Sequence, residues 1–296
     1  MVAAYFPLVD GSLNLLDYRT RVVHPGGRSA ALGIPMAETK IAFDTANDYE
    51  RFMGSWSRAI GARFLAWLGA PRDARWLDVG CGTGAFSELV LRHASPASLT
   101  GIDLSQEQIE YVRKHLPGPT FQVADSMSLP FDDREFDVVA SALVLHFIPD
   151  RAKAFAEMMR VLRSGGFVGA YTLKRTASAD FAPYAAIMAG VKSIGAETLT
   201  SPLVPEGTAD GMRASLTAAG LVDVDVAEFE VARTFQNFDE YWEIQSIPFS
   251  PPGRTIAKLS EAQRTKLRSM MREQLTEPDG SITCAAIATA GKARKP

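Results

Sequence analysis

Three glycines and a carboxylate mark the stretch of sequence best suited to chemistry. From Trp76 to Ala85 the chain reads Trp-Leu-Asp-Val-Gly-Cys-Gly-Thr-Gly-Ala, so an apolar run leads directly into a glycine-rich turn. A tight turn by itself needs one glycine and at most two, whereas three of them also let a ligand approach the backbone closely. We therefore favour a bound cofactor at this turn over a purely structural role.

Two classes of cofactor compete for the glycine-rich turn. The pattern Gly80-x-Gly82-x-x-Ala85 satisfies a loose dinucleotide fingerprint, and Asp103 follows at about the distance expected of a ribose-binding acid. Asp78 favours the other class, because a carboxylate beside the turn is a poor neighbour for a pyrophosphate. It could instead balance a cofactor that carries an ammonium and a sulfonium, as S-adenosylmethionine does.

Short apolar runs alternate with helical patterns along the middle of the chain. This alternation predicts parallel crossover units, and hence an α/β fold with helices on both faces of a sheet. A long strand is expected at 222–235, and a final strand at 281–290 is expected to pair antiparallel with it. The expected strands and helices of the middle region are Ala74–Val79, Ala85–His93, Ser98–Ile102, Ser105–His115, Thr120–Val123, Phe136–Ala140, Arg151–Val161 and Phe167–Thr172.

A set of motifs in this order resembles the class I S-adenosylmethionine-dependent methyltransferases, and within them the small-molecule branch of ubiquinone and menaquinone biosynthesis. The resemblance is strong over Tyr49–Thr172 and weak elsewhere. It implies a Rossmann-like, mostly parallel seven-stranded sheet whose final strand is antiparallel. The motifs are Leu77–Gly84, Gly101–Ser105, Ala124-Asp125, Leu129-Pro130-Phe131, Phe136–Val139 and Leu162–Gly166.

The resemblance assigns the cofactor's methionine and ribose portions. It implies that Gly80, Gly82 and Gly84 wrap the methionine portion and that Asp78 lies near its amino group. Asp103 would accept hydrogen bonds from both ribose hydroxyls, which suits an ionised carboxylate. The alternative for Asp103 is a helix N-cap, a role that Ser105 could also fill.

The resemblance also places the adenine and the sulfur. Asp125 would accept from the adenine amino group, and its alternative is an ordinary turn-initiating aspartate. Ser141 falls where the family closes over the sulfur. The remaining cofactor residues expected from the resemblance are Cys81, Leu104, Ser126 and Met127.

Residues outside the strand ends are weaker candidates. Tyr49 and Arg51 precede the glycine turn in a helical pattern that often covers the cofactor's carboxylate end in the resembled family, although core packing and a solvated arginine are the alternatives. His146 follows the fourth expected strand and is the candidate general base. A structural role for His146 is the favoured alternative, because methyl transfer is driven mainly by alignment of the reacting atoms.

Composition excludes several classes of partner. With 31 basic and 34 acidic residues the net charge is −3, so nucleic acid is not an expected partner. The two cysteines, Cys81 and Cys284, and the scattered histidines predict neither a disulfide framework nor a metal site, and they fit a reducing, cytoplasmic compartment. No apolar run is long enough to span a membrane. The oligomeric state is left open.

The chain divides into an extension and one domain. Residues 1–35 lack periodicity and are expected to be a poorly ordered extension or a start-site artefact, and 36–296 to form the methyltransferase domain. A helical cap is expected at about 176–206 and 236–258, where aromatic residues indicate a partly apolar pocket for a small organic acceptor. The expected reaction is methyl transfer to a C, N or O nucleophile. A nicotinamide-dependent oxidoreductase and a non-catalytic cofactor-binding protein remain as alternatives.

Overall fold

A computed structural model describes residues 8–9, 12–13, 46–174, 182–199 and 203–296 of the chain. Nearly all of the predicted extension, 1–35, lies outside the described residues; only the two-residue strands β1 (Leu8–Val9) and β2 (Ser12–Leu13), which pair with each other, are placed there.

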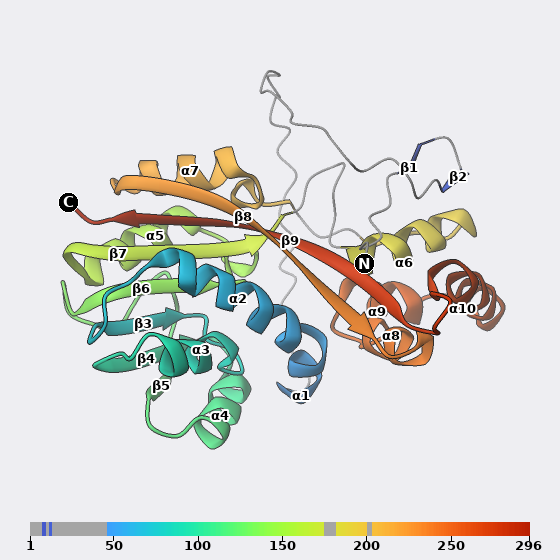
Figure 1. Cartoon of the computed structure of the whole chain (residues 1–296), viewed down its shortest axis with the longest axis horizontal. Helices are drawn as coiled ribbons and strands as arrows, with labels where there is room; N and C mark the ends of the chain where they lie inside the picture. The colour runs from blue at the N-terminus through green and yellow to red at the C-terminus, as the bar shows by residue number, and fades with distance from the viewer. Residues whose placement is uncertain (1–7, 10–11, 14–45, 175–181, 200–202) are drawn as a thin grey trace.

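A seven-stranded sheet forms the centre of the molecule (Figure 1). Its strands run in the order β5-β4-β3-β6-β7-β9-β8. Strand β9 runs antiparallel to both of its neighbours, β7 and β8, and all other neighbouring strands pair in parallel. This confirms the predicted fold, including the antiparallel final strand. The strands are β3 (Arg75–Val79), β4 (Ser98–Asp103), β5 (Thr120–Val123), β6 (Phe136–Ala142), β7 (Leu162–Leu173), β8 (Val222–Phe235) and β9 (Ile282–Arg294).

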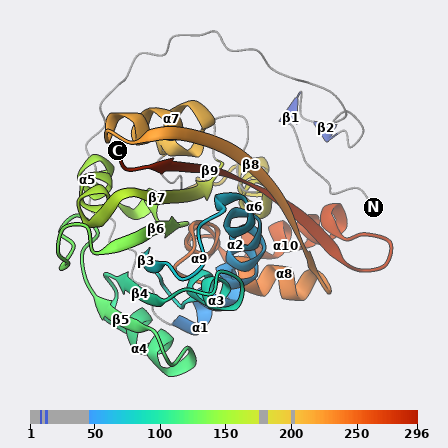
Figure 2. The same cartoon turned by 60° about the vertical axis from the view of Figure 1, so that its left-hand side comes forward.

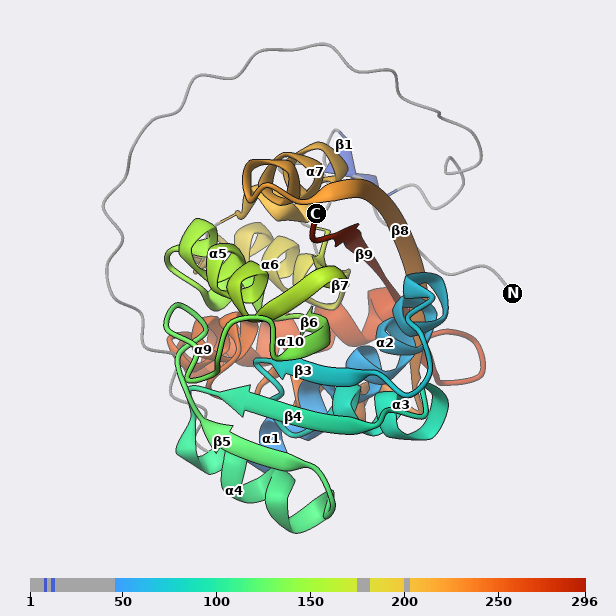
Figure 3. The ribbon, with the colours of Figure 1, turned by 90° about the vertical axis from the view of Figure 1, so that its left-hand side faces the viewer.

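Helices cover both faces of the sheet, as the end-on view in Figure 3 shows. Successive side chains of a strand point to opposite faces, so Trp76 and Leu77 of β3 belong to different core clusters. Helices α2 (Ser55–Leu68) and α3 (Ala85–His93) pack on the Trp76 side, and α5 (Arg151–Val161) and α7 (Ala209–Ala218) on the Leu77 side. Helix α4 (Gln106–His115) packs through Ile109 and Val112 against Phe121 of β5.

Side-chain caps fix where several helices begin. Ser105, Asp150 and Thr208 each accept a hydrogen bond from a backbone amide three residues later, which satisfies a donor that the first helical turn leaves unpaired. Ser260 and Gln263 form a complete capping box. These hydrogen bonds fix the residue at which each of these helices begins.

Strands β8 and β9 extend beyond the rest of the sheet as a two-stranded ribbon (Figures 1 and 2). Pairing of β9 with β7 stops at Leu173 and Ala288, whereas pairing with β8 continues to the pair Phe235 and Ile282. Four helices gather around the free part of the ribbon, and they are called the cap here: α6 (Ala182–Ser193), α8 (Phe238–Gln245), α9 (Pro251–Ala257) and α10 (Glu261–Leu275).

The cap is larger than the segments predicted at about 176–206 and 236–258. Helix α10 packs closely on α6, because a Cβ at Gly190 would lie 2.7 Å from Leu267 Cδ1 and from Met271 Sδ. The sequence analysis did not include α10 in the cap, because local pattern does not show that α10 packs against α6. Among the described residues, no helix is both long and apolar enough to cross a membrane.

Candidate functional site

The glycine-rich turn joins the carboxyl end of β3 to the N-terminus of α3. The amides of Gly80 and Cys81 both donate to Ile102 O of β4, at 2.7 and 2.8 Å, which holds the turn against the neighbouring strand. Gly80, Gly82 and Gly84 have φ angles of +78°, +53° and +89°, a region that side chains with a Cβ disfavour. The turn therefore requires all three glycines for its backbone conformation.

The surroundings of the three glycines differ. A Cβ at Gly80 would lie 2.6 Å from Val144 Cγ1, and one at Gly84 would lie 2.5 Å from Val112 Cγ2, so both positions are closed by packing. At Gly82 a Cβ would meet only Tyr49 Cε1, at 3.8 Å. Gly82 is thus the glycine whose missing side chain leaves space on the site's side of the turn.

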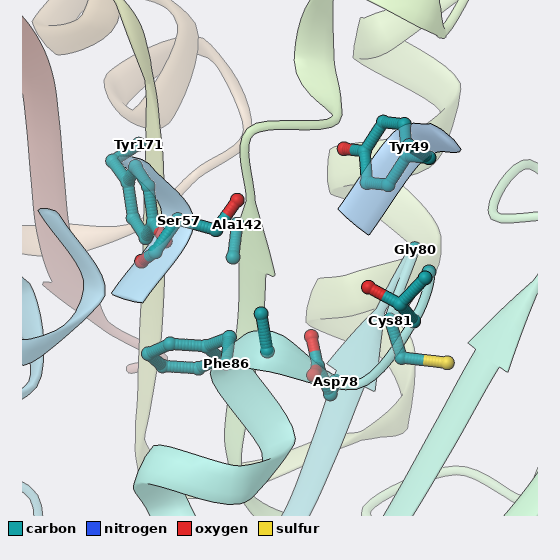
Figure 4. A pocket seen from close by; sticks show the side chains of 11 residues that line it. Tyr49, Ser57, Asp78, Gly80, Cys81, Phe86, Ala142 and Tyr171 are labelled. Atoms are coloured by element: carbon teal, nitrogen blue, oxygen red, sulfur yellow. The ribbon is translucent and has the colours of Figure 1, made fainter. Parts of the chain in front are cut away.

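Asp78 is buried beside this turn with one carboxylate oxygen unpaired. Its exposed fraction is 1%, and Ser87 Oγ donates to Oδ2 at 2.6 Å, while Oδ1 has no hydrogen-bond partner among the described residues. Burial raises the pKa of Asp78 to about 7. The hydrogen bond from Ser87 acts in the opposite direction and lowers the pKa, whereas the negative charge of Asp103 raises it further. Figure 4 shows its carboxylate facing the space between Ala142 and the turn. An orphaned buried oxygen of this kind is suited to a cationic donor.

Asp103 at the end of β4 anchors two backbone segments. Oδ2 accepts from the Gly82 amide at 3.0 Å and Oδ1 from the Ser105 amide at 2.9 Å. The N-cap of α4 is Ser105, so the N-cap alternative for Asp103 is not what the structure shows. An ionised carboxylate has about four acceptor positions, so each oxygen can accept one further bond from a ligand. Burial raises the pKa of Asp103.

The neighbouring strand end offers apolar surface next to Asp103. Leu104 is 73% exposed and Val123, which pairs with Asp103, is 43% exposed. Two exposed aliphatic side chains at adjacent strand ends suit the face of a planar ring.

Asp125 initiates a turn, as its structural alternative predicted. Its Oδ1 accepts from the Met127 amide at 2.8 Å. Ser126 and Met127 lie in the same turn, half-buried, so the three residues sit together beside the end of β5.

Cys81 contributes its backbone to the site, not its thiol. The side chain packs with Ile109, Val112 and Phe121 in a small core cluster. Burial raises the pKa of the thiol well above its usual value. Figure 4 accordingly shows the sulfur directed away from Asp78.

The segment before α2 lies over the glycine-rich turn. It consists of α1 (Ala46–Tyr49) and one π-helical turn, η1 (Glu50–Gly54). Tyr49 faces Gly82, and burial raises the pKa of its hydroxyl. Glu50 accepts from Thr83 Oγ1 at 2.8 Å and also from Arg58. The cavity between Tyr49, Asp78 and the glycine-rich turn measures about 20 Å³, roughly the room that one water molecule needs. Because α1 and η1 cover it, these two elements are called the lid here.

Arg51 does not reach the glycine-rich turn. Its Nη2 donates to Glu243 Oε1 of α8 at 2.6 Å, on the exposed side of the lid. The structure thus places Arg51 against α8 and not against the turn. Arg58 is linked to the turn through Glu50, which also accepts from Thr83, and it pairs with Glu88 as well.

The close approach of Gly54 to the Glu50 side chain predicts that one substitution destabilises the wild-type protein but stabilises a variant without Glu50. The three atoms nearest to a Cβ placed at Gly54 all belong to the Glu50 carboxyl group, with Cδ at 2.5 Å. Gly54→Ala should therefore push Glu50 off Thr83. The lost hydrogen bond to a charged group costs about 1.5–3 kcal/mol, more than the gain of about 0.5–1 kcal/mol in helix propensity, so the wild-type protein should be destabilised. With Glu50→Ala already present, the same change should stabilise by roughly 0.5–1 kcal/mol through helix propensity.

Urea unfolding of the two single variants and the double variant measures both free-energy changes. Equal destabilisation by Gly54→Ala in both backgrounds would contradict the role of Glu50.

His146 and Ser141 lie at the carboxyl end of β6. Ser141 Oγ is fully buried and has no hydrogen-bond partner in the described chain. His146 Nδ1 lies 3.5 Å from Thr172 Oγ1, at the end of β7. The structure thus brings His146 to a strand end and places a hydroxyl, a neutral group, beside its ring.

Several residues that line the cavity were not singled out as site residues from sequence: Ser57, Thr83, Phe86 and Tyr171. Tyr171 is fully buried and its hydroxyl donates to Ser57 O at 3.4 Å. Its position at the end of a predicted strand was a usable signal. Ser57 could not have been found this way, because it lies in α2 and not at the end of a strand.

Comparison with known proteins identifies the domain. Residues 77–169 match the family described as "Methyltransferase domain". This segment holds the glycine-rich turn, Asp103 and the ends of β5 and β6. The chain carries a methyltransferase domain over these residues.

Curated relatives resemble this methyltransferase domain over part of their length. The phthiotriol/phenolphthiotriol dimycocerosates methyltransferase of Mycobacterium tuberculosis is 43% identical over 93 residues, which are 31% of this chain and 34% of that protein. The malonyl-[acyl-carrier protein] O-methyltransferase of Methylococcus capsulatus is 30% identical over 138 residues, 46% of this chain and 48% of its own. The matches thus span between a third and a half of these relatives.

Solved structures share the fold over most of the chain. Phosphoethanolamine N-methyltransferase 2 of Haemonchus contortus, solved with phosphomonomethylethanolamine and S-adenosylhomocysteine, superposes with a TM-score of 0.51 at 17% identity, covering 84% of this chain and 57% of that one. The YcgJ protein of Bacillus subtilis gives 0.50 at 16% identity, covering 81% and 98%. At such identities the likeness concerns the fold of the methyltransferase domain.

Proposed function

We propose that this protein transfers a methyl group from S-adenosylmethionine to a C, N or O nucleophile on a small, partly apolar organic acceptor. The observation that carries the proposal is the orphaned Oδ1 of buried Asp78, next to a turn whose Gly82 leaves open space. A pyrophosphate would be repelled at this place, whereas an ammonium would be bound. The geometry thus favours this cofactor over a nicotinamide dinucleotide, as do the matches to methyltransferases.

The chain's own residues fit the cofactor in three places. Asp78 would hold the amino group, Asp103 the ribose hydroxyls, and Leu104 with the Asp125–Met127 turn the adenine. When bound, the cofactor supplies an activated methyl group on a sulfonium. The protein's contribution is alignment of the nucleophile with the methyl carbon and exclusion of water, the latter through the lid.

An aromatic cluster connects the lid to the cap and supports an apolar acceptor. The ring of Phe249 lies 6.3 Å from that of Tyr49 and 5.4 Å from that of Phe52, and Phe52 stacks on Tyr184 of α6 at 5.7 Å. The acceptor would bind where this cluster meets the ends of β6 and β7. The resemblance to the ubiquinone and menaquinone branch stays a prediction. The acceptor panel described next would also identify the methylated atom.

The proposal is tested by titration calorimetry followed by an acceptor panel. S-Adenosylmethionine and S-adenosylhomocysteine should bind and NAD should not. Product detection across phenolic, quinone, amine and carboxylate acceptors should then find one methylated class. Binding of NAD in place of S-adenosylmethionine would overturn the cofactor assignment, and cofactor binding without any transfer would favour the non-catalytic alternative.

We also propose that the protein works in a reducing, cytoplasmic compartment. Both cysteines are buried free thiols, Cys81 in the turn and Cys284 in β9. A lysate fractionated under native conditions and probed for the protein would test this placement.

We expect His146→Ala to lower single-turnover methyl transfer less than tenfold, without a change in pH dependence. The reason is that a nucleophile held in line attacks a sulfonium methyl without a base. The measurement is a rate profile from pH 5.5 to 8.5 in both proteins with the acceptor found by the panel. A pH-dependent defect of about a hundredfold, typical of a lost general base, would make His146 catalytic.

A further inference from the structure

A buried serine determines which oxygen of Asp78 faces the site. Ser87 lies within α3, is 0% exposed, and donates its hydroxyl to Asp78 Oδ2 at 2.6 Å. Asp78 lines the cavity, and no described residue donates to its other oxygen, Oδ1. The hydroxyl of a buried serine needs a hydrogen-bond partner, and for Ser87 that partner is the Asp78 carboxylate.

The groups around Asp78 do not supply a compensating cation. Asp103 faces it from β4, the Cys81 thiol belongs to the turn, and Tyr171 faces it from β7 with its hydroxyl on Ser57 O of α2. From β6 the neutral Ser141 adjoins the same strand ends. Glu50 of the lid and Arg58 of α2 are paired with each other.

We propose that Ser87 is a positioning residue that turns Asp78 Oδ1 toward the cofactor's ammonium, and that binding of this ammonium displaces a proton from Asp78 to solvent. The proposal rests on the proposed function, because it takes S-adenosylmethionine as the ligand. It adds a linked proton equilibrium to the binding step and gives Ser87 a role in setting it.

The sign of the linkage follows from the charge environment. Burial raises the pKa of Asp78 to about 7, so near neutral pH the free protein carries a mixture of the neutral acid and the carboxylate. An adjacent ammonium favours the carboxylate and lowers this pKa. Affinity should therefore rise by up to about tenfold per pH unit below pH 7. It should fall again at a pH that deprotonates the cofactor's own ammonium, because the neutral amine no longer pairs with the carboxylate.

Calorimetry in buffers of different ionisation enthalpy measures the released proton directly. At pH 6.5 the wild-type protein should release a substantial fraction of one proton per S-adenosylmethionine, and the net release should shrink as the pH rises above 7, where Asp78 is already ionised and the cofactor's amino group begins to take up a proton on binding. 5′-Methylthioadenosine, which lacks the ammonium, should bind without release. Asp78→Asn should abolish the release and flatten the dependence of Kd on pH.

Ser87→Ala separates positioning from packing. The Ser87 bond lowers the pKa of Asp78, so its loss should move the inflection of the Kd profile to higher pH. A purely structural role would lower the melting temperature and leave the inflection in place.

The outcomes distinguish the two proposals. Binding of S-adenosylmethionine with no proton release at pH 6.5, or with release unchanged in Asp78→Asn, overturns this inference and leaves the proposed function standing. Absence of binding at every pH overturns the proposed function itself.

Discussion

Replacing Gly82 with valine should abolish measurable binding of S-adenosylmethionine. The branched side chain would enter the open space beside Tyr49, where the cofactor's methionine portion is expected, and it would strain a backbone held at φ +53°. We expect affinity to fall by at least about a hundredfold, because no neighbouring atom can move to restore the space. Titration calorimetry on the purified variant is the direct measurement.

A matched control separates strain from occlusion. Gly280 has φ +87°, and a Cβ placed on it would meet no atom within 4 Å. It lies in the turn before β9, at the far end of the cap. Gly280→Val should show a similar loss of unfolding free energy, about 1–2 kcal/mol, with cofactor affinity unchanged. Native-like affinity in a folded Gly82→Val protein would remove the glycine-rich turn from the binding site.

Asp103→Ala should weaken cofactor binding by about 1.5–3 kcal/mol, roughly 10- to 150-fold, the range for hydrogen bonds to a charged group. The structure adds a second effect that the sequence did not predict. The amides of Gly82 and Ser105 lose their acceptor, so the unfolding free energy should fall as well. Calorimetric Kd and urea unfolding report the two effects independently.

Asp279 provides the control for Asp103. It accepts from the amide two residues later, Ser281, as Asp103 does from Ser105, but it lies in the exposed turn before β9. Asp279→Ala should leave Kd unchanged. Equal Kd values for wild type and Asp103→Ala would show that the carboxylate serves only the backbone.

The order of strands and helices could be predicted because it depends on local pattern. Apolar runs of strand length alternate with helical spacing from Ala74 to Thr172, and the crossover rule then leaves few topologies. The site residues at strand ends followed from the same reasoning. Asp78 and Asp103 lie at the ends of adjacent parallel strands, which must share one edge of the sheet.

The side chains that the lid presents to the glycine-rich turn could not be predicted, for a geometric reason. The π-helical turn at Glu50–Gly54 inserts about one residue into the helix, which rotates everything before it by roughly 100°. The resemblance placed Arg51 near the cofactor, whereas in the structure Arg51 pairs with Glu243 and Glu50 contacts Thr83 of the turn. Likewise, Gly80 is constrained by Val144, a contact between residues far apart in the sequence that no local pattern shows.

The ribbon of β8 and β9 has a consequence for how the specificity of such a protein can change. Phe235 and Ile282 are the last paired residues of the two strands, so everything between them is an insertion at the tip of one hairpin. Its length and sequence can vary without altering the register of any strand that positions Asp78 or Asp103. Three of the four cap helices lie in this insertion, α8, α9 and α10. Exchange of residues 236–281 between relatives would therefore transplant three cap helices as one cassette, together with their contacts to the lid through Glu243 and Phe249, while the strand ends that carry Asp78 and Asp103 keep their register.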